Sequence, residues 1–310
     1  MQTPAESFVQ ANTNGRLHDA REGSISPLDR GFLYGDAVYE VWRTYGGVLF
    51  GVQEHWERLQ ASAGGLGLRL PLDLGRLLAE ARRTIAAARS VTGWAGEHYV
   101  RLQVTRGAGA IGLDPGLAGP EGCLWVLLVK PLADLTEKEL NAGLKVGLAT
   151  LVRRNDPRTV PPELKTGNYL NNVLALREAL ATGAQEVLMV NLEGRITEGS
   201  VRNIWFVEGE TAYTPPLEDG LLAGVTRRIL FEHVVKAEGV RLRERALRPE
   251  DLGGFSECFA TSTTQDVAPV GCVGERLFAL GPGTLTRRLK TAFRAYVEVY
   301  NAAHPEYRVG

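Results

Sequence analysis

The stretch "ELKTGNYLNNVLALREAL", residues 163–180, holds one of only six lysines in a chain whose other cationic side chains are all arginine. The apolar residues behind Lys165 recur at helical spacing and predict a helix whose buried face is formed by Leu170, Val173, Leu174 and Leu180. A primary amine can condense with an aldehyde, which a delocalised guanidinium cannot usefully do. Lys165 is therefore a candidate Schiff-base lysine, and the alternative is a solvated lysine in a loop before a helix.

Composition bounds the class of protein. The chain has 310 residues, which favours two domains, and its hydrophobic (44%) and charged (23%) fractions are ordinary for a globular protein. A formal net charge of −1 gives no electrostatic case for nucleic acid or an anionic membrane. No apolar run approaches the roughly 20 residues that span a bilayer, and the N-terminus lacks the features of a signal peptide. We expect neither a nucleic-acid nor a membrane partner.

The cysteines and histidines indicate a cytoplasmic protein without a metal. Three cysteines, Cys123, Cys258 and Cys272, are an odd number without metal-type spacing, which fits reduced thiols in the cytoplasm. The five histidines are scattered, and no two of them have the spacing of metal ligands. We therefore predict no metal site.

Strand-like and helix-like segments interleave along the chain, which predicts a mixed α and β class. A hairpin is expected over residues 37–50, with Gly46-Gly47 as its turn, and an amphipathic helix over residues 73–89. Further expected elements are a hairpin over 186–199 with its turn at 191–194, a second hairpin over 203–215, a helix between Gly224 and Gly239, and a final helix over 283–300.

The segment "PLADLTEKELNAG", residues 131–143, is the best candidate for a domain boundary. A proline ends a strand there, and polar residues follow before the next strand-like run. We expect an N-terminal domain over residues 1–132, a linker over 133–142 and a C-terminal domain over 143–310.

Four other features carry possible chemistry, each with an ordinary alternative. Glu198 is either a carboxylate in a turn or the partner of a pyridinium nitrogen. The helix start at Gly224 is either an anion site, suited to phosphate, or a simple cap. The hydroxyl-rich "TSTT", residues 261–264, offers phosphate contacts or is a polar turn. Arg58 is a third phosphate contact or an exposed helix residue.

The order and spacing of these features are more specific than any one of them. The chain resembles the class IV (fold-type IV) pyridoxal-phosphate-dependent aminotransferases, most of all the branched-chain enzymes. The blocks that carry the resemblance are "SPLDRGFLYGDAVYEVWRTYGG", "EHWERL", "YVRLQVTRGAGAIGLDPG", "ELKTGNYLNNVLALREA", "EGRITEGSVRNIWFV", "LLAGVTRR" and "CFATSTTQDVAPV". The resemblance implies a two-domain fold with a smaller N-terminal α/β domain and a larger, barrel-like C-terminal α/β domain.

The resemblance also implies roles for particular residues. Lys165 matches the lysine that holds pyridoxal 5'-phosphate as a Schiff base, Glu198 the carboxylate on the pyridine nitrogen, and Tyr169 the tyrosine on the phenolic oxygen. The positions that match phosphate contacts are Arg58, Val225, Thr226 and Thr263. The positions that match the substrate pocket are Tyr39, Arg43, Tyr99, Arg101, Thr263 and Thr264. Asn203 falls in a strand behind the cofactor, where a structural role is as plausible as a direct one.

The implied activity is transamination between an amino acid and a 2-oxo acid, by a homodimer or a higher homo-oligomer. On the question of substrate, "YVRL" and "TRGAGAIGLDPG" look most like the branched-chain enzymes, and the arginine and histidine of the D-amino-acid enzymes' carboxylate trap are missing from "AGAIGLDPG". Against this, Ser262-Thr263-Thr264 replaces the usual Gly-Thr-Ala turn and resembles the D-amino-acid enzymes, and Asp266 stands where glutamate is usual.

Two other kinds of protein stay open at this point. A D-amino-acid transaminase, an (R)-amine transaminase or an aminodeoxychorismate lyase would retain the same lysine and glutamate, although the lyases usually lack a tyrosine at the position of Tyr169. A non-catalytic binding protein on the same scaffold would be expected to lose Lys165 or Glu198, and both are present.

Overall fold

The computed structural model describes residues 8–234 and 239–310, which form two compact units. Unit 1 contains the described residues up to Ala133 together with two further segments, Leu164–Asn168 and Val299–Gly310. Unit 2 contains Asp134–Glu163 and Tyr169–Glu298. Lys165 therefore belongs to the same unit as the N-terminal residues, whereas the helix behind it belongs to unit 2. The sequence-based domain limits stay a prediction.

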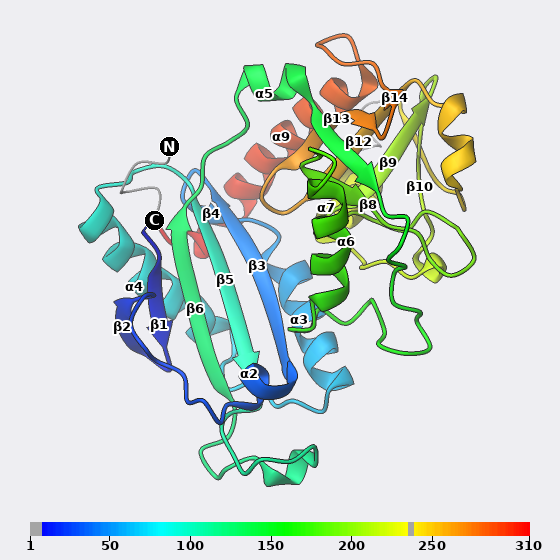
Figure 1. The fold of residues 1–310 in the computed structure, drawn as a ribbon. Helices are drawn as coiled ribbons and strands as arrows, with labels where there is room; N and C mark the ends of the chain where they lie inside the picture. Colours follow the sequence, from blue (N-terminus) through cyan, green and yellow to red (C-terminus); the bar gives the residue numbers. More distant parts are fainter. Residues whose placement is uncertain (1–7, 235–238) are drawn as a thin grey trace. The chain divides into compact units, whose positions relative to one another are not determined.

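Unit 1 is built on a six-stranded sheet in the order β2-β1-β6-β5-β3-β4 (Figure 1). The strands are β1 (Gln10–Thr13), β2 (Arg16–Asp19), β3 (Ala37–Tyr45), β4 (Val48–Leu49), β5 (His98–Thr105) and β6 (Leu124–Pro131). The helices are α2 (Arg30–Tyr34), α3 (Val52–Gly65) and α4 (Leu74–Thr92). The expected hairpin is confirmed as β3–β4, and both Gly46 and Gly47 have the positive φ that such a turn demands.

The two faces of this sheet differ because side chains alternate along each strand. Helix α3 packs on the face that carries Trp42, whose ring lies 5.6 Å from that of His55. Helix α4 covers the same face further along, where Glu80 accepts a hydrogen bond from Asn12 (2.8 Å). The other face carries Tyr39, Arg43, Tyr99 and Arg101, four of the residues that the sequence predicts to line the substrate pocket.

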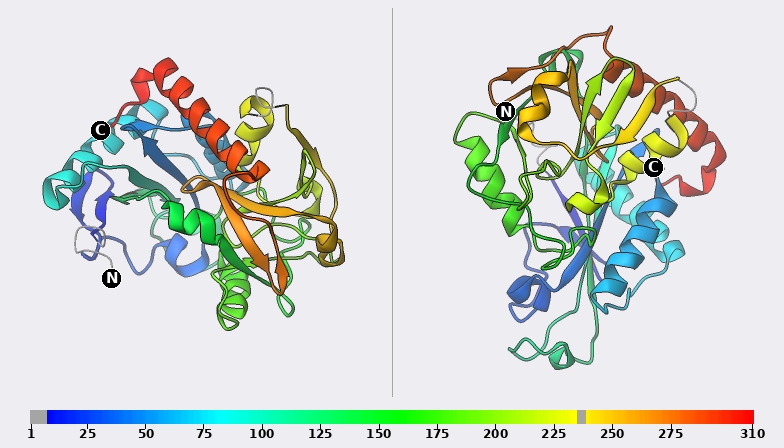
Figure 2. Two further views of the ribbon diagram at one scale, coloured as in Figure 1. Left: turned by 90° about the horizontal axis from the view of Figure 1, so that it is seen from above. Right: turned by 90° about the vertical axis from the view of Figure 1, so that its right-hand side faces the viewer.

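Unit 2 is built on a second, mixed sheet in the order β11-β10-β9-β12-β13-β7-β8, with β14 paired to β13. Figure 2 gives two further views of the ribbon, in which the strands of this sheet are green to orange. Its strands are β7 (Leu144–Leu148), β8 (Glu186–Leu188), β9 (Asn203–Glu208), β10 (Thr211–Thr214), β11 (Arg241–Glu244), β12 (Glu257–Ser262), β13 (Asp266–Val273) and β14 (Arg276–Leu277). Its helices are α5 (Glu137–Ala142), α6 (Leu170–Leu180), α7 (Val225–Ile229) and the unit 2 part of α9 (Leu285–Ala303).

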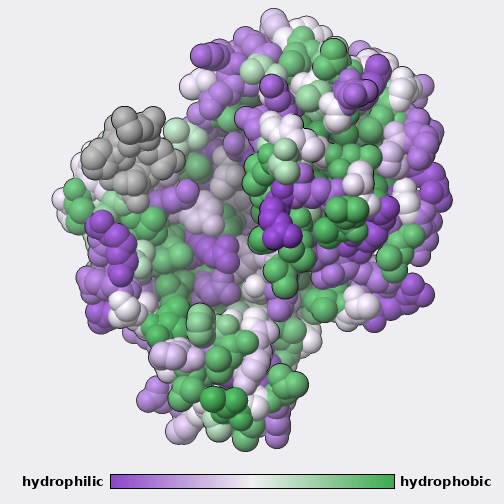
Figure 3. Space-filling view, in the orientation of Figure 1, coloured by the Kyte–Doolittle hydropathy of each residue, from purple (hydrophilic) through white to green (hydrophobic). Residues whose placement is uncertain are grey.

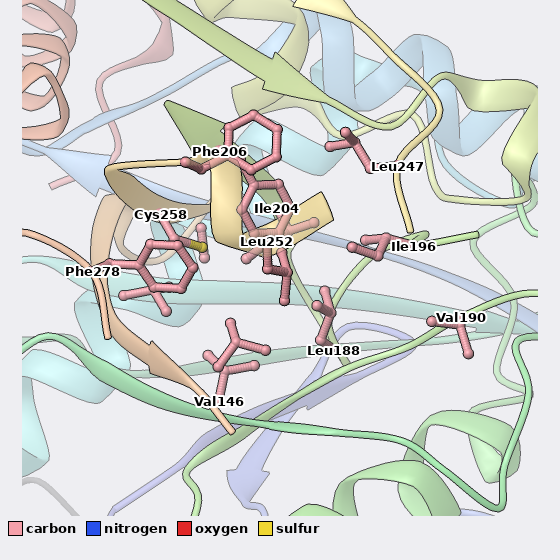
Figure 4. Close-up of a cluster of buried hydrophobic side chains, with 14 residues drawn as sticks. Val146, Leu188, Val190, Ile196, Ile204, Phe206, Leu247, Leu252, Cys258 and Phe278 are labelled. Atoms are coloured by element: carbon pink, nitrogen blue, oxygen red, sulfur yellow. The ribbon is translucent and has the colours of Figure 1, made fainter. Parts of the chain in front are cut away.

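The core of unit 2 anchors the segment that carries Glu198. Figure 4 shows Ile196, Ile204 and Phe206 among the apolar side chains of this core, and all three are at most 2% exposed. Ile196 precedes Glu198 by two residues, and Ile204 follows Asn203 directly. Both ends of the loop that carries Glu198 are therefore fixed by buried side chains.

Helix α6 forms where the sequence predicts it, but the prediction of its buried face is wrong. Its buried residues are Asn172, Ala175 and Ala179, whereas the exposed ones include Leu170 (69%), Val173 (56%) and Leu180 (54%); Leu174 is half-buried. The reason is close packing on β7, because a Cβ at Gly147 would lie only 2.7 Å from Cβ of Ala179. Only small side chains fit at this contact, so the large apolar ones face outward.

Three further expectations differ in detail. The expected linker over residues 133–142 contains α5, which begins with a capping box between Thr136 and Glu139. The turn at residues 191–194 is present, and the two arms of the expected hairpin pair irregularly, through a bridge between Val190 and Ile196 and hydrogen bonds between Met189 and residues 197 and 198. Strand β8 itself pairs in parallel with β7. Helix α7 begins after Gly224 as expected and continues as a π-helix over Leu230–Val234; its expected end lies outside the described residues.

Candidate active site

In unit 1, backbone pairing places Lys165 at the edge of the sheet. Thr166 forms an antiparallel bridge with Val38, and the N–H of Tyr39 donates to the carbonyl of Lys165 (3.0 Å). The N–H of Lys165 donates to Oγ of Ser62 on α3 (3.0 Å). Because residues opposite each other in an antiparallel pair share a face, the side chains of Lys165 and Tyr39 project to the same side.

The Tyr39 ring contacts two cationic groups. Nζ of Lys165 is 4.4 Å from the ring centroid, and the guanidinium carbon of Arg101 is 3.7 Å from it. Both distances are those of cation–π contacts. The structure thus brings together three of the predicted residues, the Schiff-base candidate and two pocket candidates, on one face of unit 1.

Tyr99 and Arg43 lie opposite each other further along this face. Arg43 is fully buried, its guanidinium carbon lies 4.0 Å from the centroid of the Tyr45 ring, and Nε donates to the carbonyl of Thr44 (3.2 Å). The sequence analysis did not single out Lys130, which is opposite Tyr99 in the register and has its amine 5.3 Å from the Tyr99 ring. The sequence feature that could have pointed to Lys130 is that it is the first lysine of the chain and lies near the end of a strand.

Arg58 is not an exposed helix residue, because it pairs with a buried carboxylate. Its Nε donates to Oε1 of Glu40 (2.6 Å) and its Nη2 to Oε2 (3.0 Å), while Nδ1–H of His55 donates to Oε2 (2.8 Å). Burial alone would raise the pKa of Glu40, but the charges of Arg58 and His55 and their hydrogen bonds outweigh it and hold that pKa well below its usual range. Burial also lowers the pKa of His55. No sequence pattern pointed to Glu40 or His55.

In unit 2, Glu198 is buried and both of its carboxylate oxygens have partners. Oε1 pairs with Arg154 (2.8 Å), and Oε2 accepts the N–H of Leu222 (3.1 Å) and a longer contact from Nδ2 of Asn203 (3.4 Å). Asn203 also donates to the carbonyl of Leu222 (2.9 Å). Asn203 thus contacts both Glu198 and the loop before α7, which supports a positioning role for it.

Arg154 is a further residue to which no sequence pattern pointed. Its side chain is only 9% exposed, and its Nη1 donates to Oδ1 of Asn172 (3.2 Å) on α6. Asn172 in turn donates to the carbonyl of Ser200 (2.7 Å), two residues after Glu198. The signal was the pair Arg153-Arg154 at the start of the proline-rich stretch "RRNDPRTVPPE", residues 153–163, but nothing in that pattern says which carboxylate the arginine pairs with.

The start of α7 has the features of an anion-binding helix end. Gly224 is the N-cap and supplies no side chain to cap the helix, and a Cβ there would lie 1.9 Å from Oδ1 of Asn203. Val225 and Thr226 form the first turn and are buried. Unsatisfied N–H groups and the helix dipole both favour an anion at such an end.

Thr263 and Thr264 lie in the three-residue turn between β12 and β13, where Ser262 pairs with Asp266. Both threonines are half-buried, as is Tyr169, which is the N-cap residue of α6 and the first residue of unit 2 after Asn168. Within unit 2 the predicted residues thus occupy a loop, a helix start and a turn, all at ends of regular elements.

These residues fit pyridoxal 5'-phosphate. A buried carboxylate that is fixed by an arginine suits a ring nitrogen, an uncapped helix start and hydroxyl groups suit a phosphate, and a lysine fixed by strand pairing suits an aldehyde. The donor types in the two units are those that this cofactor requires.

Comparison with known proteins gives the class. Residues 37–272 match the Amino-transferase class IV family. A Methanocaldococcus jannaschii protein that carries the description of a branched-chain-amino-acid aminotransferase is 32% identical over 282 residues, which cover 91% of this chain and 94% of that protein. The D-alanine aminotransferase of Bacillus licheniformis is 30% identical over 288 residues, with coverage of 91% and 94%.

The fold agrees with this result. The branched-chain aminotransferase of the thermophilic archaeon Thermoproteus uzoniensis, solved with norvaline, has a TM-score of 0.82 at 28% identity and covers 96% of this chain and 98% of that chain. Another structure of this kind, a branched-chain amino acid aminotransferase solved with pyridoxamine 5'-phosphate, has a TM-score of 0.81 at 28% identity. The chain belongs to the class IV aminotransferases and is a pyridoxal-phosphate-dependent enzyme that catalyses transamination. No helix among residues 8–234 and 239–310 is long and apolar enough to cross a membrane.

Proposed function

We propose that this enzyme transfers the amino group of a branched-chain L-amino acid to a 2-oxo acid, with Lys165 as its catalytic residue. The observation that carries the proposal is the placement of the Lys165 amine over the Tyr39 ring, next to Arg101, by strand pairing. The relatives described as branched-chain enzymes support the substrate, and so does the segment 107–122, which contains neither arginine nor histidine.

Each residue has a definite task in this proposal. Bound pyridoxal phosphate supplies an electron sink for the carbanion that forms when the substrate α-carbon loses its proton. Nζ of Lys165 accepts that proton and returns it in the later step. Glu198, held by Arg154 and Asn203, keeps a proton at the ring nitrogen, and Tyr169 donates to the phenolic oxygen.

The remaining predicted residues bind and orient. The phosphate is bound by Arg58, Val225, Thr226 and Thr263, and Glu40 and His55 hold the guanidinium of Arg58 in place. The substrate is bound by Tyr39, Arg43, Tyr99, Arg101, Thr263 and Thr264. These assignments combine the family resemblance with the donor types and the burial that the structure gives these side chains.

A panel of amino donors tests the substrate. We expect L-leucine to change the visible spectrum of the bound cofactor, and D-alanine and (R)-phenylethylamine to leave it unchanged. The second candidate is a D-amino-acid transaminase, favoured by the Ser262-Thr263-Thr264 turn and by the D-alanine aminotransferase relative. A spectral change with D-alanine and none with L-leucine selects that second candidate.

The proposal includes a homodimer. Unit 1 exposes an apolar patch on α2 and the loop 106–122, in which Phe32 (74%), Ile111 (75%) and Leu113 (79%) are the most exposed members (Figure 3). A patch of this kind on a monomer usually marks an interaction surface. We expect a dimer in sedimentation, weakened by Ile111→Lys with Leu113→Lys and unaffected by Val91→Lys. A monomeric wild-type enzyme contradicts this part of the proposal.

Three free cysteines support a cytoplasmic location.

A further inference from the structure

A buried ion cluster lies beside the turn that carries Thr263 and Thr264. Asp266 follows this turn directly, is 0% exposed, and has a φ of 49° in the left-handed region. That conformation costs a non-glycine residue about 1 kcal/mol or more, so the surroundings of Asp266 must hold it there.

Two cations from α9 hold the Asp266 carboxylate. Oδ1 accepts the N–H of Val267 (2.6 Å) and pairs with Lys290, while Oδ2 accepts Nε of Arg294 (2.7 Å). Nζ of Lys290 also donates to the carbonyl of Val267 (3.2 Å), with a longer contact to that of Gln265 (3.5 Å). A single ammonium group thus ties the backbone on both sides of Asp266.

The opposite flank of the turn is held by a different cation. Arg202 donates to the side-chain oxygen of Gln265 and, through Nε, to Oε2 of Glu186 (3.0 Å). Oε1 of Glu186 accepts the N–H of Ser200 (2.8 Å). The turn is therefore connected on one side to α9 and on the other to the loop that carries Glu198.

We propose that Asp266 and Lys290 are positioning residues that fix the hydroxyl groups of Thr263 and Thr264 for the phosphate of the cofactor, without touching it. This inference rests on the proposed function, because it takes Thr263 as a phosphate contact. Loss of the Lys290 charge leaves the buried Asp266 with Arg294 as its remaining counter-charge and removes the ammonium group that bonds the backbone on both sides of Asp266. Loss of the Asp266 charge leaves both cations without this partner, so in either variant the turn must rearrange. A displaced turn withdraws its hydroxyl groups from the phosphate, and the ring of the cofactor keeps its other contacts.

The test compares two ligands of the apoenzyme, pyridoxal 5'-phosphate and pyridoxal, which lacks the phosphate. We expect Lys290→Met to weaken binding of the phosphorylated ligand about tenfold, the loss of one charge-assisted hydrogen bond, and to leave the affinity for pyridoxal unchanged. Asp266→Asn, which keeps the size of the side chain, should act in the same direction. Arg288→Met is the control, because Arg288 lies on the same helix in an exposed pair with Glu210 (2.8 Å) and should change neither affinity.

The ratio of the two affinities separates positioning from a general structural role. A purely structural cluster weakens both ligands alike, whatever its effect on the melting temperature, and that result overturns the proposal. An unchanged ratio in folded Lys290→Met and Asp266→Asn does the same. If Lys290→Met does not fold, Asp266→Asn carries the test with the same two outcomes. A wild-type apoenzyme that binds neither ligand contradicts the proposed function itself, together with the inference built on it.

Discussion

Lys165 projects from a short segment that pairs with the edge of β3, and the carbonyl of Lys165 accepts the N–H of Tyr39. The chemistry of a primary amine and the family resemblance both pointed to Lys165. Its surroundings depend on a pairing between segments about 125 residues apart, and no local pattern encodes that pairing. The same holds for Arg58, whose partner Glu40 lies on a strand and whose neighbour His55 lies one helical turn before it.

The first residue-scale prediction concerns the lysine itself. Lys165→Ala should lower kcat about a thousandfold or more, because the variant lacks the amine that moves the proton. Binding of pyridoxal phosphate should survive in part through its phosphate contacts, which equilibrium dialysis can measure. Lys138→Ala, in α5, is the matched control and should retain wild-type activity. Transamination by Lys165→Ala at near wild-type rate excludes the assigned role.

His98 gives a prediction about pH. It is 1% exposed, neither ring nitrogen has a hydrogen-bond partner among the described residues, and burial, assisted by the nearby charge of Arg89, lowers its pKa to about 4. The unfolded chain binds a proton at this residue below about pH 6.5 and the folded chain does not. Above pH 6.5 His98 is neutral in both states and does not lower the free energy of unfolding. As the pH falls from 6.5 toward 4, the free energy of unfolding falls by about 1.4 kcal/mol per pH unit, because only the unfolded chain takes up the proton.

Urea unfolding of wild type and His98→Leu at two pH values tests this sign. Leucine does not titrate, so the variant should gain about 2 kcal/mol relative to wild type when the pH is lowered from 7 to 5. A difference between the two proteins that is the same at both pH values contradicts the prediction.

At the scale of elements, α6 shows where sequence patterns stop being informative. Apolar residues at helical spacing predicted that the helix exists, because this spacing is typical of an amphipathic helix. It did not predict the face that packs inward, because the contact with β7 selects small residues rather than hydrophobic ones. The turns were easier to predict: Gly46-Gly47 and Gly209 adopt the positive φ that their positions in the hairpins require.

The contact of α6 with β7 gives a prediction about stability. Gly147→Ala adds a Cβ that lies 2.7 Å from Cβ of Ala179 and 3.1 Å from its Cα, so the helix must move away from the strand. Overpacking of this kind typically costs about 1–3 kcal/mol of unfolding free energy. Gly253→Ala is the control, because a Cβ there meets nothing within 4 Å. Equal unfolding midpoints for the two variants argue against a tight helix–strand contact.

At the scale of the whole molecule, the chain passes from one compact unit to the other at residues 133/134, 163/164, 168/169 and 298/299. Composition and the proline-marked break near residue 131 predicted two parts. They did not predict that residues 164–168 and 299–310 belong to unit 1. Segments this short have too few residues for a hydrophobic pattern of their own, and their structure depends on the unit against which they pack. The consequence is that Lys165 and Glu198 belong to different units.

The last prediction uses this division. If Lys165 and Glu198 bind the same cofactor, the cofactor adds free energy that is lost when either unit unfolds. The holoenzyme should then melt in a single transition by calorimetry. The apoenzyme should melt at a lower temperature, because a ligand present at 100 times its Kd adds about 2.7 kcal/mol to the free energy of unfolding. Without the cofactor, the melting transitions of the two units should also be separated or broadened. Lys165→Ala with added cofactor should fall between the two, because the phosphate contacts remain while the covalent bond is lost. Identical melting curves with and without pyridoxal phosphate contradict a cofactor shared by residues of both units.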